Sequence, residues 1–99
     1  MKNQMTGKIA NIIGKDKLSK YMKLTEKAIE IAKRNINSSK KGEAKEIIDM
    51  VENYISDAKF FEKKSDFVNA FAAINYAHGW LDAGARLKIF NVKDNKLFT

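Results

Sequence analysis

The stretch FVNAFAAINYAHGWLDAGARLKIF, residues 67–90, decides the fold because its apolar residues recur every three or four positions. That spacing places them along one side of an α-helix, and the pattern runs too long for a β-strand. The sequence therefore predicts a helix over about residues 66–90 with one side packed on other helices. The residues of this core side are Phe67, Ala70, Phe71, Ile74, Ala77, Leu81 and Ala85.

Two more helical patterns precede it, over about residues 43–64 and 16–37. Asp16 is a predicted N-cap of the first helix, and Ser65 or Asp66 of the third. The chain has no proline, so the breaks are assigned to NSSKKG (37–42) and KKSD (63–66). The apolar stripes of the two helices are Leu18, Tyr21, Met22, Thr25, Ala28, Ile29, Ala32 and Ile36, and Ala44, Ile47, Ile48, Val51, Tyr54, Ile55, Ala58 and Phe61.

Three helices joined by short loops predict an all-α fold, a three-helix antiparallel (up-down-up) bundle. The 99 residues suffice for one domain, 1–99. We expect a short N-terminal segment, MTGKIANIIG (5–14), before the bundle and an apolar C-terminal tail, IFNVKDNKLF (89–98), after it.

The composition argues against several kinds of chemistry. The chain has no cysteine, which excludes disulfides, thiolate zinc sites and cysteine nucleophiles. It also lacks a phosphate-binding glycine loop and a nucleophile elbow. We therefore expect no enzyme activity, no cofactor and no metal. No apolar run approaches the roughly 20 residues of a membrane span, so we expect a cytoplasmic protein.

Positive charge is concentrated at one end of the chain. Residues 1–40 contain ten Lys or Arg and three Asp or Glu, which accounts for the whole net charge of +7. Lys20, Lys23, Lys27 and Arg34 fall on one outward stripe of the first helix and are the candidate phosphate-binding residues. The alternatives are a solvated surface, or partial neutralisation by the net-negative second helix packed beside the first.

The third helix has a second apolar side that a three-helix bundle does not need. Tyr76, Trp80, Ala83 and Leu87, together with Ala72, form this side and are the candidate partner-binding residues. Three candidates for packing over this side remain: the N-terminal segment, the C-terminal tail, or another protein, which would be a second copy in a homodimer or a partner helix. The tail is the better intramolecular cover, because its apolar residues would otherwise meet water.

A narrow polar strip, which we call the polar notch, separates the two apolar sides. Its residues are Asn75, His78, Gly79, Asp82 and Arg86. The spacing of His78 and Asp82 predicts a hydrogen bond between them, but two ligands are too few for a metal site. Gly79 leaves a gap in the strip, and three interpretations of it are open: room for a ligand group, room for another backbone, or a tolerated surface glycine. Gly84 would let a neighbouring helix approach closely.

Residues 54–90, YISDAKFFEKKSDFVNAFAAINYAHGWLDAGARLKIF, resemble the small archaeal helical domain of unknown function numbered three-five-seven. The resemblance covers the second and third helices closely and the first only by its pattern. It implies an archaeal cytosolic helical bundle and supplies no activity and no catalytic residue.

These features favour a non-enzymatic protein-interaction module that uses the Tyr76 and Trp80 side of the third helix. The alternative is an electrostatic nucleic-acid binder that uses the basic stripe. A small-molecule site in the polar notch is the least favoured. The first two differ in salt dependence, since only binding to phosphates weakens steeply as salt rises.

Overall fold

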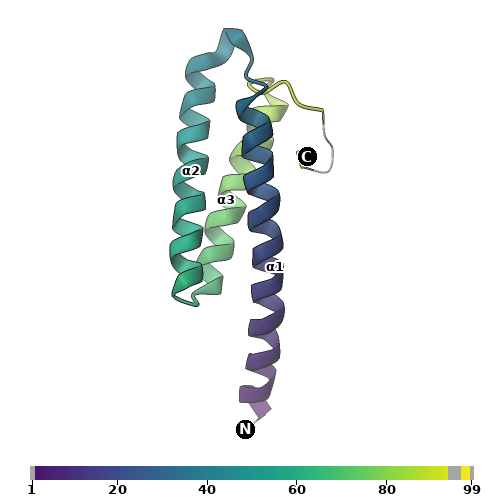
Figure 1. Ribbon diagram of the computed structural model, residues 1–99, viewed down its shortest axis with the longest axis vertical. Helices are drawn as coiled ribbons and strands as arrows, with labels where there is room; N and C mark the ends of the chain where they lie inside the picture. Colours follow the sequence, from purple (N-terminus) through teal and green to yellow (C-terminus); the bar gives the residue numbers. More distant parts are fainter. Residues whose placement is uncertain (1, 94–96, 99) are drawn as a thin grey trace.

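The described part of the chain forms three helices in an antiparallel bundle, as the sequence predicts (Figure 1). The computed structural model describes the backbone of residues 2–93 and 97–98, and the side chains of residues 14–93 and 97–98. Helices α1 (Lys2–Lys33), α2 (Lys41–Lys63) and α3 (Phe67–Arg86) run up, down and up, with a 3₁₀ turn, η1 (Ser38–Lys40), before α2. The molecule is elongated, measuring 58 × 24 × 16 Å.

Helix α3 is the centre of the packing. It lies behind and between α1 and α2 in Figure 1, and both of them pack on it more extensively than on each other. The predicted stripes supply the core, although Tyr21 stays 39% exposed. The buried apolar residues of the three helices are Leu18, Met22, Ala28, Ile29, Ala32, Ala44, Ile47, Val51, Ile55, Ala58, Ala70, Ala73, Ile74, Ala77 and Leu81.

The predicted start of the first helix is wrong. Helix α1 begins at Lys2 rather than near Asp16, so the N-terminal segment 5–14 is part of the helix and not a separate element. Without a proline the segment has no strong helix breaker, and a glycine such as Gly14 lowers helix stability by only about 1 kcal/mol. Whether side chains 5–13 cover α3 lies outside the described residues.

A tight turn joins α2 to α3. Ser65 has a left-handed backbone with φ 59°, and the amide of Asp66 donates to the Phe61 carbonyl at 2.9 Å. Together with the bond from the Ser65 amide to the Glu62 carbonyl, this is a Schellman ending of α2. Asp66 then caps α3, because its carboxylate accepts from the Asn69 amide. Of the two predicted caps, Asp66 is therefore the one used.

The third helix ends at Arg86, four residues before the predicted end. Lys88 adopts φ 59°, and the Ile89 amide donates to the Gly84 carbonyl at 2.9 Å, which forms a second Schellman ending. The chain then turns toward the loop after α1, where the Asn37 amide donates to the Ile89 carbonyl and the Asn91 amide to the Asn35 carbonyl. These bonds fix the start of the tail.

The tail packs on the bundle, as its apolar residues predict. Phe90 is fully buried, and Ile89, Leu97 and Phe98 are 4–6% exposed. Phe90 lies against Gly84: a Cβ atom on this glycine would come 2.5 Å from the ring and 3.4 Å from Ile47 on α2. Gly84 was predicted to let a neighbouring helix approach closely, and this is right only in part. Ile47 of α2 does lie near Gly84, but the Phe90 ring of the tail lies nearer.

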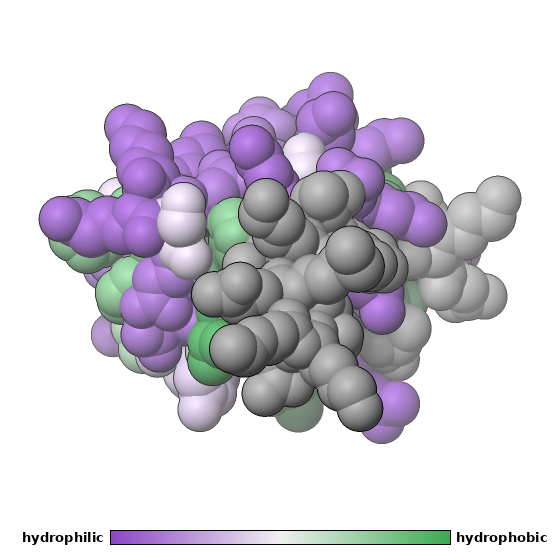
Figure 2. Space-filling view, turned by 90° about the horizontal axis from the view of Figure 1, so that it is seen from below, coloured by the Kyte–Doolittle hydropathy of each residue, from purple (hydrophilic) through white to green (hydrophobic). Residues whose placement is uncertain are grey.

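The outer sides of α1 and α2 are mostly polar. Seen from the end of the molecule at which α1 begins (Figure 2), hydrophilic residues make up most of the surface shown in colour, and hydrophobic residues reach it in small patches. This distribution follows the amphipathic patterns of the sequence. Large exposed apolar side chains occur on all three helices, and α3 and its C-cap carry the most, Val68, Tyr76, Trp80 and Leu87, against Tyr21 on α1 and Met50 and Phe60 on α2.

Candidate functional site

The second apolar side of α3 stays open to solvent. Tyr76 is 62% exposed, Trp80 39% and Leu87 61%. In Figure 1 the described start of the tail leaves the end of α3 toward the end of α1, where the Asn91 amide donates to the Asn35 carbonyl. The tail therefore packs on the bundle without covering these side chains, which corrects the expectation that it is their best cover. We call Ala72, Tyr76, Gly79, Trp80, Ala83 and Leu87 the α3 face.

Four of the six residues of the α3 face lie in an uncharged part of a highly charged chain, and Ala83 and Leu87 follow it. Charged residues make up 31% of the sequence, yet residues 67–81 contain none. At about 1.5 Å per residue this uncharged stretch is roughly 20 Å long. Its solvent-facing residues are apolar or amides, so water has no charged group to hydrate here. Such a surface suits contact with another apolar surface.

A shallow hollow of about 320 Å³ opens in the middle of the α3 face. Asn75, Tyr76, Gly79, Trp80 and Ala83 line it. Gly79 forms part of the floor. Apart from the backbone of its own helix, no heavy atom lies within 4 Å of the place where a Cβ atom at this position would be. The hollow therefore exists because position 79 has no side chain.

One wall of the hollow is held by a contact between helices. The rings of Tyr54 on α2 and Tyr76 on α3 stack with centroids 5.5 Å apart and planes 27° from parallel. Offset stacking of this kind contributes about 0.5–1.5 kcal/mol beyond the area it buries. Tyr76 is thus held in place in spite of its exposure, which lowers the entropic cost of using it as a contact residue.

The polar notch opens beside the hollow, toward α1, and shares Asn75 and Gly79 with it. A pocket of about 340 Å³ brings four of its predicted residues, Asn75, His78, Gly79 and Asp82, next to Tyr21, Leu24, Thr25 and Ile74. Arg86 does not line this pocket. The structure therefore assembles most of the notch, with α1 as a second wall that the sequence did not predict.

The ring of His78 is oriented by α1 rather than by its own helix. Its Nδ1 lies 3.1 Å from the Thr25 hydroxyl, which is a hydrogen bond, and Thr25 is only 2% exposed. The predicted partner Asp82 lies 3.7 Å from Nε2, which is within ion-pair range but too far for a hydrogen bond. The sequence does contain an indication of this hydrogen bond. Thr25 lies on the apolar stripe of the first helix, and a buried hydroxyl needs a hydrogen-bond partner.

The notch offers few ligands for a metal ion. In the part of the chain that the structure describes, no three His, Asp or Glu side chains lie close enough together to hold one. His78 and Asp82 could supply two ligands, which is fewer than protein zinc sites use. The arrangement suits a structural hydrogen bond that joins α1 to α3.

The basic stripe of α1 is exposed, as predicted. Lys20, Lys23, Lys27 and Arg34 all lie in solvent, and their side chains form no ion pair with the residues described. Acidic residues stand between them, however. Glu26 pairs with Lys59 of α2 at 3.4 Å, and Glu30 lies 3.7 Å from Lys33. The positive field of the stripe is therefore interrupted.

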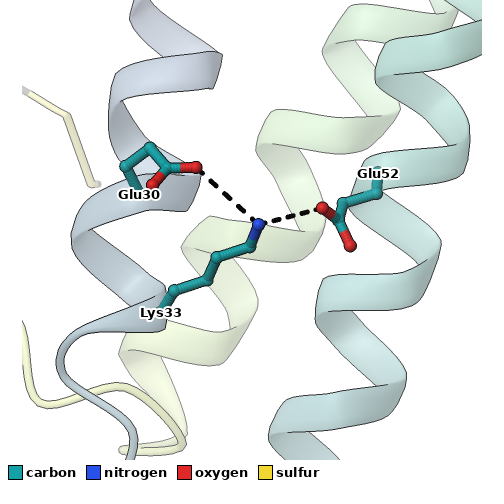
Figure 3. Close-up of polar contacts among 3 residues, drawn as sticks. All are labelled: Glu30, Lys33 and Glu52. Atoms are coloured by element: carbon teal, nitrogen blue, oxygen red, sulfur yellow. Dashed lines mark hydrogen bonds and ion pairs between the residues drawn. The ribbon is translucent and has the colours of Figure 1, made fainter.

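Among the described side chains, two ion pairs connect α1 with α2. Lys33 reaches the Glu52 carboxylate at 2.9 Å (Figure 3), and this hydrogen bond raises the pKa of Lys33 above its ordinary value of 10.5. The Lys33–Glu52 pair has the polarity expected from a positive first and negative second helix. The Glu26–Lys59 pair has the reverse polarity. Specific pairs of both polarities, rather than net helix charge, thus link these two helices.

A comparison of the sequence with protein-family models finds a match, over residues 20–90, to the family described as "Protein of unknown function (DUF357)". The chain belongs to the DUF357 family. The DUF357 match begins at the first residue of the basic stripe and ends at Phe90, so it contains the α3 face and the polar notch as well. No curated protein and no solved structure matches the chain. Within the described residues, no helix has the length and apolar character needed to cross a membrane.

Proposed function

We propose that this DUF357 protein is a non-enzymatic interaction module that binds a protein partner through the α3 face. The observation that carries the proposal is the exposure of Tyr76 and Trp80 around a hollow in an uncharged surface. Tyr and Trp are the residue types enriched in the energetically dominant centres of protein interfaces. The role needs no cofactor or metal, and its proposed setting is the cytoplasm.

The composition of the α3 face favours a protein over a nucleic acid as its ligand. Nucleic-acid binding draws most of its affinity from Lys and Arg contacts with phosphates. Residues 67–81 have no such side chain to offer. An apolar partner surface would gain roughly 25 cal/mol for each Å² of apolar area removed from water.

Nucleic-acid binding through α1 is the second candidate. It is supported by the exposure of Lys20, Lys23, Lys27 and Arg34 and by their lack of ion pairs among the described residues. Glu26 and Glu30 weaken it, because they place negative charge within the same stripe. The α3 face has no comparable counter-argument, so it ranks first.

Site-specific photo-crosslinking separates the two candidates. A benzoylphenylalanine at position 76 reports on the α3 face. One at position 30 reports on the basic stripe, since Glu30 is exposed and lies within about one helical turn of Lys27 and Arg34. We expect position 76 to crosslink to protein in a cell extract. Excess unlabelled wild type should compete, and excess Trp80→Ala should not. Crosslinks to nucleic acid from position 30, with none from position 76, would overturn the proposal.

A further inference from the structure

One end of the bundle carries a basic surface that the proposed function does not use. It lies on the outer sides of α1 and α2, next to the turn between α2 and α3, at the end of the molecule shown in Figure 2. Apart from Ser19, which is half-buried, every side chain in it is exposed. We call this surface the basal face, and its residues are Ser19, Lys20, Lys23, Lys27, Lys59, Phe60, Lys63 and Lys64.

A hollow of about 360 Å³ lies between α1 and α2 in the basal face. It is lined by Ser19, Met22, Lys23, Glu26, Lys59, Glu62 and Lys63. The Lys59 ammonium pairs with the Glu26 carboxylate at 3.4 Å, whereas Lys23 and Lys63 form no ion pair with the residues described. The three lysines also outnumber the two carboxylates. The hollow therefore favours an anion, and a phosphate group has the charge and the acceptor oxygens to bind both unpaired lysines.

A large apolar ring stands beside this hollow. Phe60 is 54% exposed, and its ring meets that of Phe61 edge-on with centroids 5.5 Å apart. The Lys64 ammonium lies 5.3 Å from the centroid of the Phe60 ring, and Lys63 is three residues along the same helix, so ammonium groups border the ring. An apolar side chain among lysines suits the boundary of a phospholipid bilayer, where charged headgroups meet acyl chains.

Helix α1 continues past the basal face. Residues 19–23 of α1 and 59–63 of α2 line the same hollow, so the helix before about residue 15 projects beyond the turn at residues 64–66, as Figure 1 shows. At about 1.5 Å per residue the projection is roughly 20 Å long. Its sequence contains Met5, Ile9, Ile12 and Ile13. At about 100° per residue, these four positions fall within the same arc of about 100° as positions 20, 23 and 27, so aliphatic residues and lysines follow each other along one side of α1.

From these features we infer that the basal face binds the surface of an anionic phospholipid bilayer. The lysines contact headgroup phosphates, one of which occupies the hollow between Lys23 and Lys63, and the Phe60 ring enters the boundary between headgroups and acyl chains. The protein lies on the bilayer in this arrangement and does not cross it. The inference goes beyond the proposed function, because the α3 face lies on a different helix and stays open to a protein partner.

Charge and apolarity together favour a bilayer over the other partners that lysines attract. A nucleic acid would satisfy the lysines through its phosphates. Its bases stack on aromatic or arginine side chains, however, so it has no use for the aliphatic residues of α1, whereas acyl chains take such residues out of water. A second copy of this chain would bring the same lysines together and be repelled.

Vesicle sedimentation with the full chain tests the charge of the basal face. We expect binding to vesicles made of equal parts phosphatidylcholine and phosphatidylglycerol, and none to phosphatidylcholine alone. Lys23→Gln combined with Lys63→Gln should weaken binding by about 25-fold, because each lysine near an anionic bilayer contributes a factor of about five. Both residues are exposed and form no ion pair with the described residues, so the variant should unfold at the wild-type temperature.

Lys88→Gln combined with Lys93→Gln is the matched control. It removes the same charge from two exposed residues that follow α3, at the other end of the bundle. Because salt screens charges beyond about 10 Å, this variant should bind within about threefold of wild type. Equal weakening by both double variants would show a response to net charge alone and contradict a site at the basal face. A wild-type protein that binds neither kind of vesicle, or both equally, would contradict it as well.

Phe60→Ser tests whether an apolar side chain enters the bilayer. It should weaken binding to the anionic vesicles about fivefold or more, since the variant has no ring to remove from water. Trp80→Ala is the control, because it removes an exposed aromatic side chain from the α3 face, and it should bind like wild type. Loss of binding in Trp80→Ala and none in Phe60→Ser would assign the lipid contact to the α3 face and overturn the inference.

A labelled oligothymidylate separates lipid from nucleic acid. Its binding to the full chain is followed by fluorescence anisotropy at the salt concentration of the vesicle experiment. We expect weak binding of the strand that the anionic vesicles abolish. A protein that holds the strand in the presence of excess vesicles would refute the inference and assign the basal face to nucleic acid.

Discussion

The Phe90 ring occupies the space that a side chain at position 84 would need. A Cβ atom on Gly84 would lie 2.5 Å from Cε2 and 2.6 Å from Cδ2 of the ring. Phe90 is fully buried, and the Asn37 and Asn91 amides hold the backbone on either side of it. The glycine therefore allows the tail to close on the bundle.

Replacing Gly84 with alanine should destabilise the fold. Overpacking of a core costs about 1–3 kcal/mol, which exceeds the gain of up to about 1 kcal/mol from removing a helical glycine. Gly79→Ala is the control, since it adds the same methyl group in open space and should stabilise. Urea unfolding of both variants measures the difference. Equal effects at the two positions would show that Phe90 does not restrict position 84.

Replacing Ser65 with glycine should stabilise the protein. Ser65 adopts φ 59°, a conformation that costs a residue with a Cβ atom roughly 1–2 kcal/mol and glycine much less. The gain should be somewhat smaller than this strain, because glycine is also more flexible in the unfolded chain. Ser65→Ala is the control and should not stabilise. An unfolding midpoint for Ser65→Gly below that of wild type would contradict the assignment of this turn.

Removing the Thr25 hydroxyl should weaken the connection between α1 and α3. Thr25→Val keeps the shape but loses the hydrogen bond to His78 Nδ1, at a cost of about 1 kcal/mol. Thr25→Ser retains the hydroxyl and tests for the effect of the lost methyl group. The free energy of unfolding in urea gives the result. If the valine variant is as stable as wild type, the hydrogen bond does not contribute to folding.

The Lys33–Glu52 pair should make stability depend on pH at the alkaline end. Because the folded pKa of Lys33 is raised above 10.5, its contribution is fully present below that pH and is lost as the pH rises through the folded value. The Lys33 side chain is 35% exposed, so the effect should stay below about 1 kcal/mol. Glu52→Gln should flatten the alkaline slope of the unfolding midpoint. Asp49→Asn, in the more exposed pair with Lys45, should leave the slope unchanged.

The apolar periodicity predicted the bundle because the pattern is set by burial on one side of each helix. It placed Leu18, Val51 and Leu81 in the core, where the structure has them. It could not place the start of α1 at Lys2, since Asp16 is compatible with an N-cap and also with a helix interior. It extended α3 to about Phe90, because the left-handed Lys88 has no signature such as glycine.

The candidate site was predicted in its residues but not in its contacts. The exposed positions of α3 follow from its helical phase, so Tyr76 and Trp80 could be assigned to one side. The stacking of Tyr76 on Tyr54, and the hydrogen bond of His78 to Thr25, depend on how far one helix slides along another. Periodicity within one helix does not contain that information.

A native mass spectrum of the protein purified at low salt tests the central claim most directly, with Trp80→Ala recorded beside it. If the α3 face binds protein, the spectrum should show a complex. Its mass should be either twice the chain mass of 11.3 kDa or one chain mass plus that of another protein, and the complex should be lost in Trp80→Ala. A chain that carries nucleic-acid mass, retains it in Trp80→Ala and releases it at high salt would contradict the account and assign binding to the basic stripe of α1.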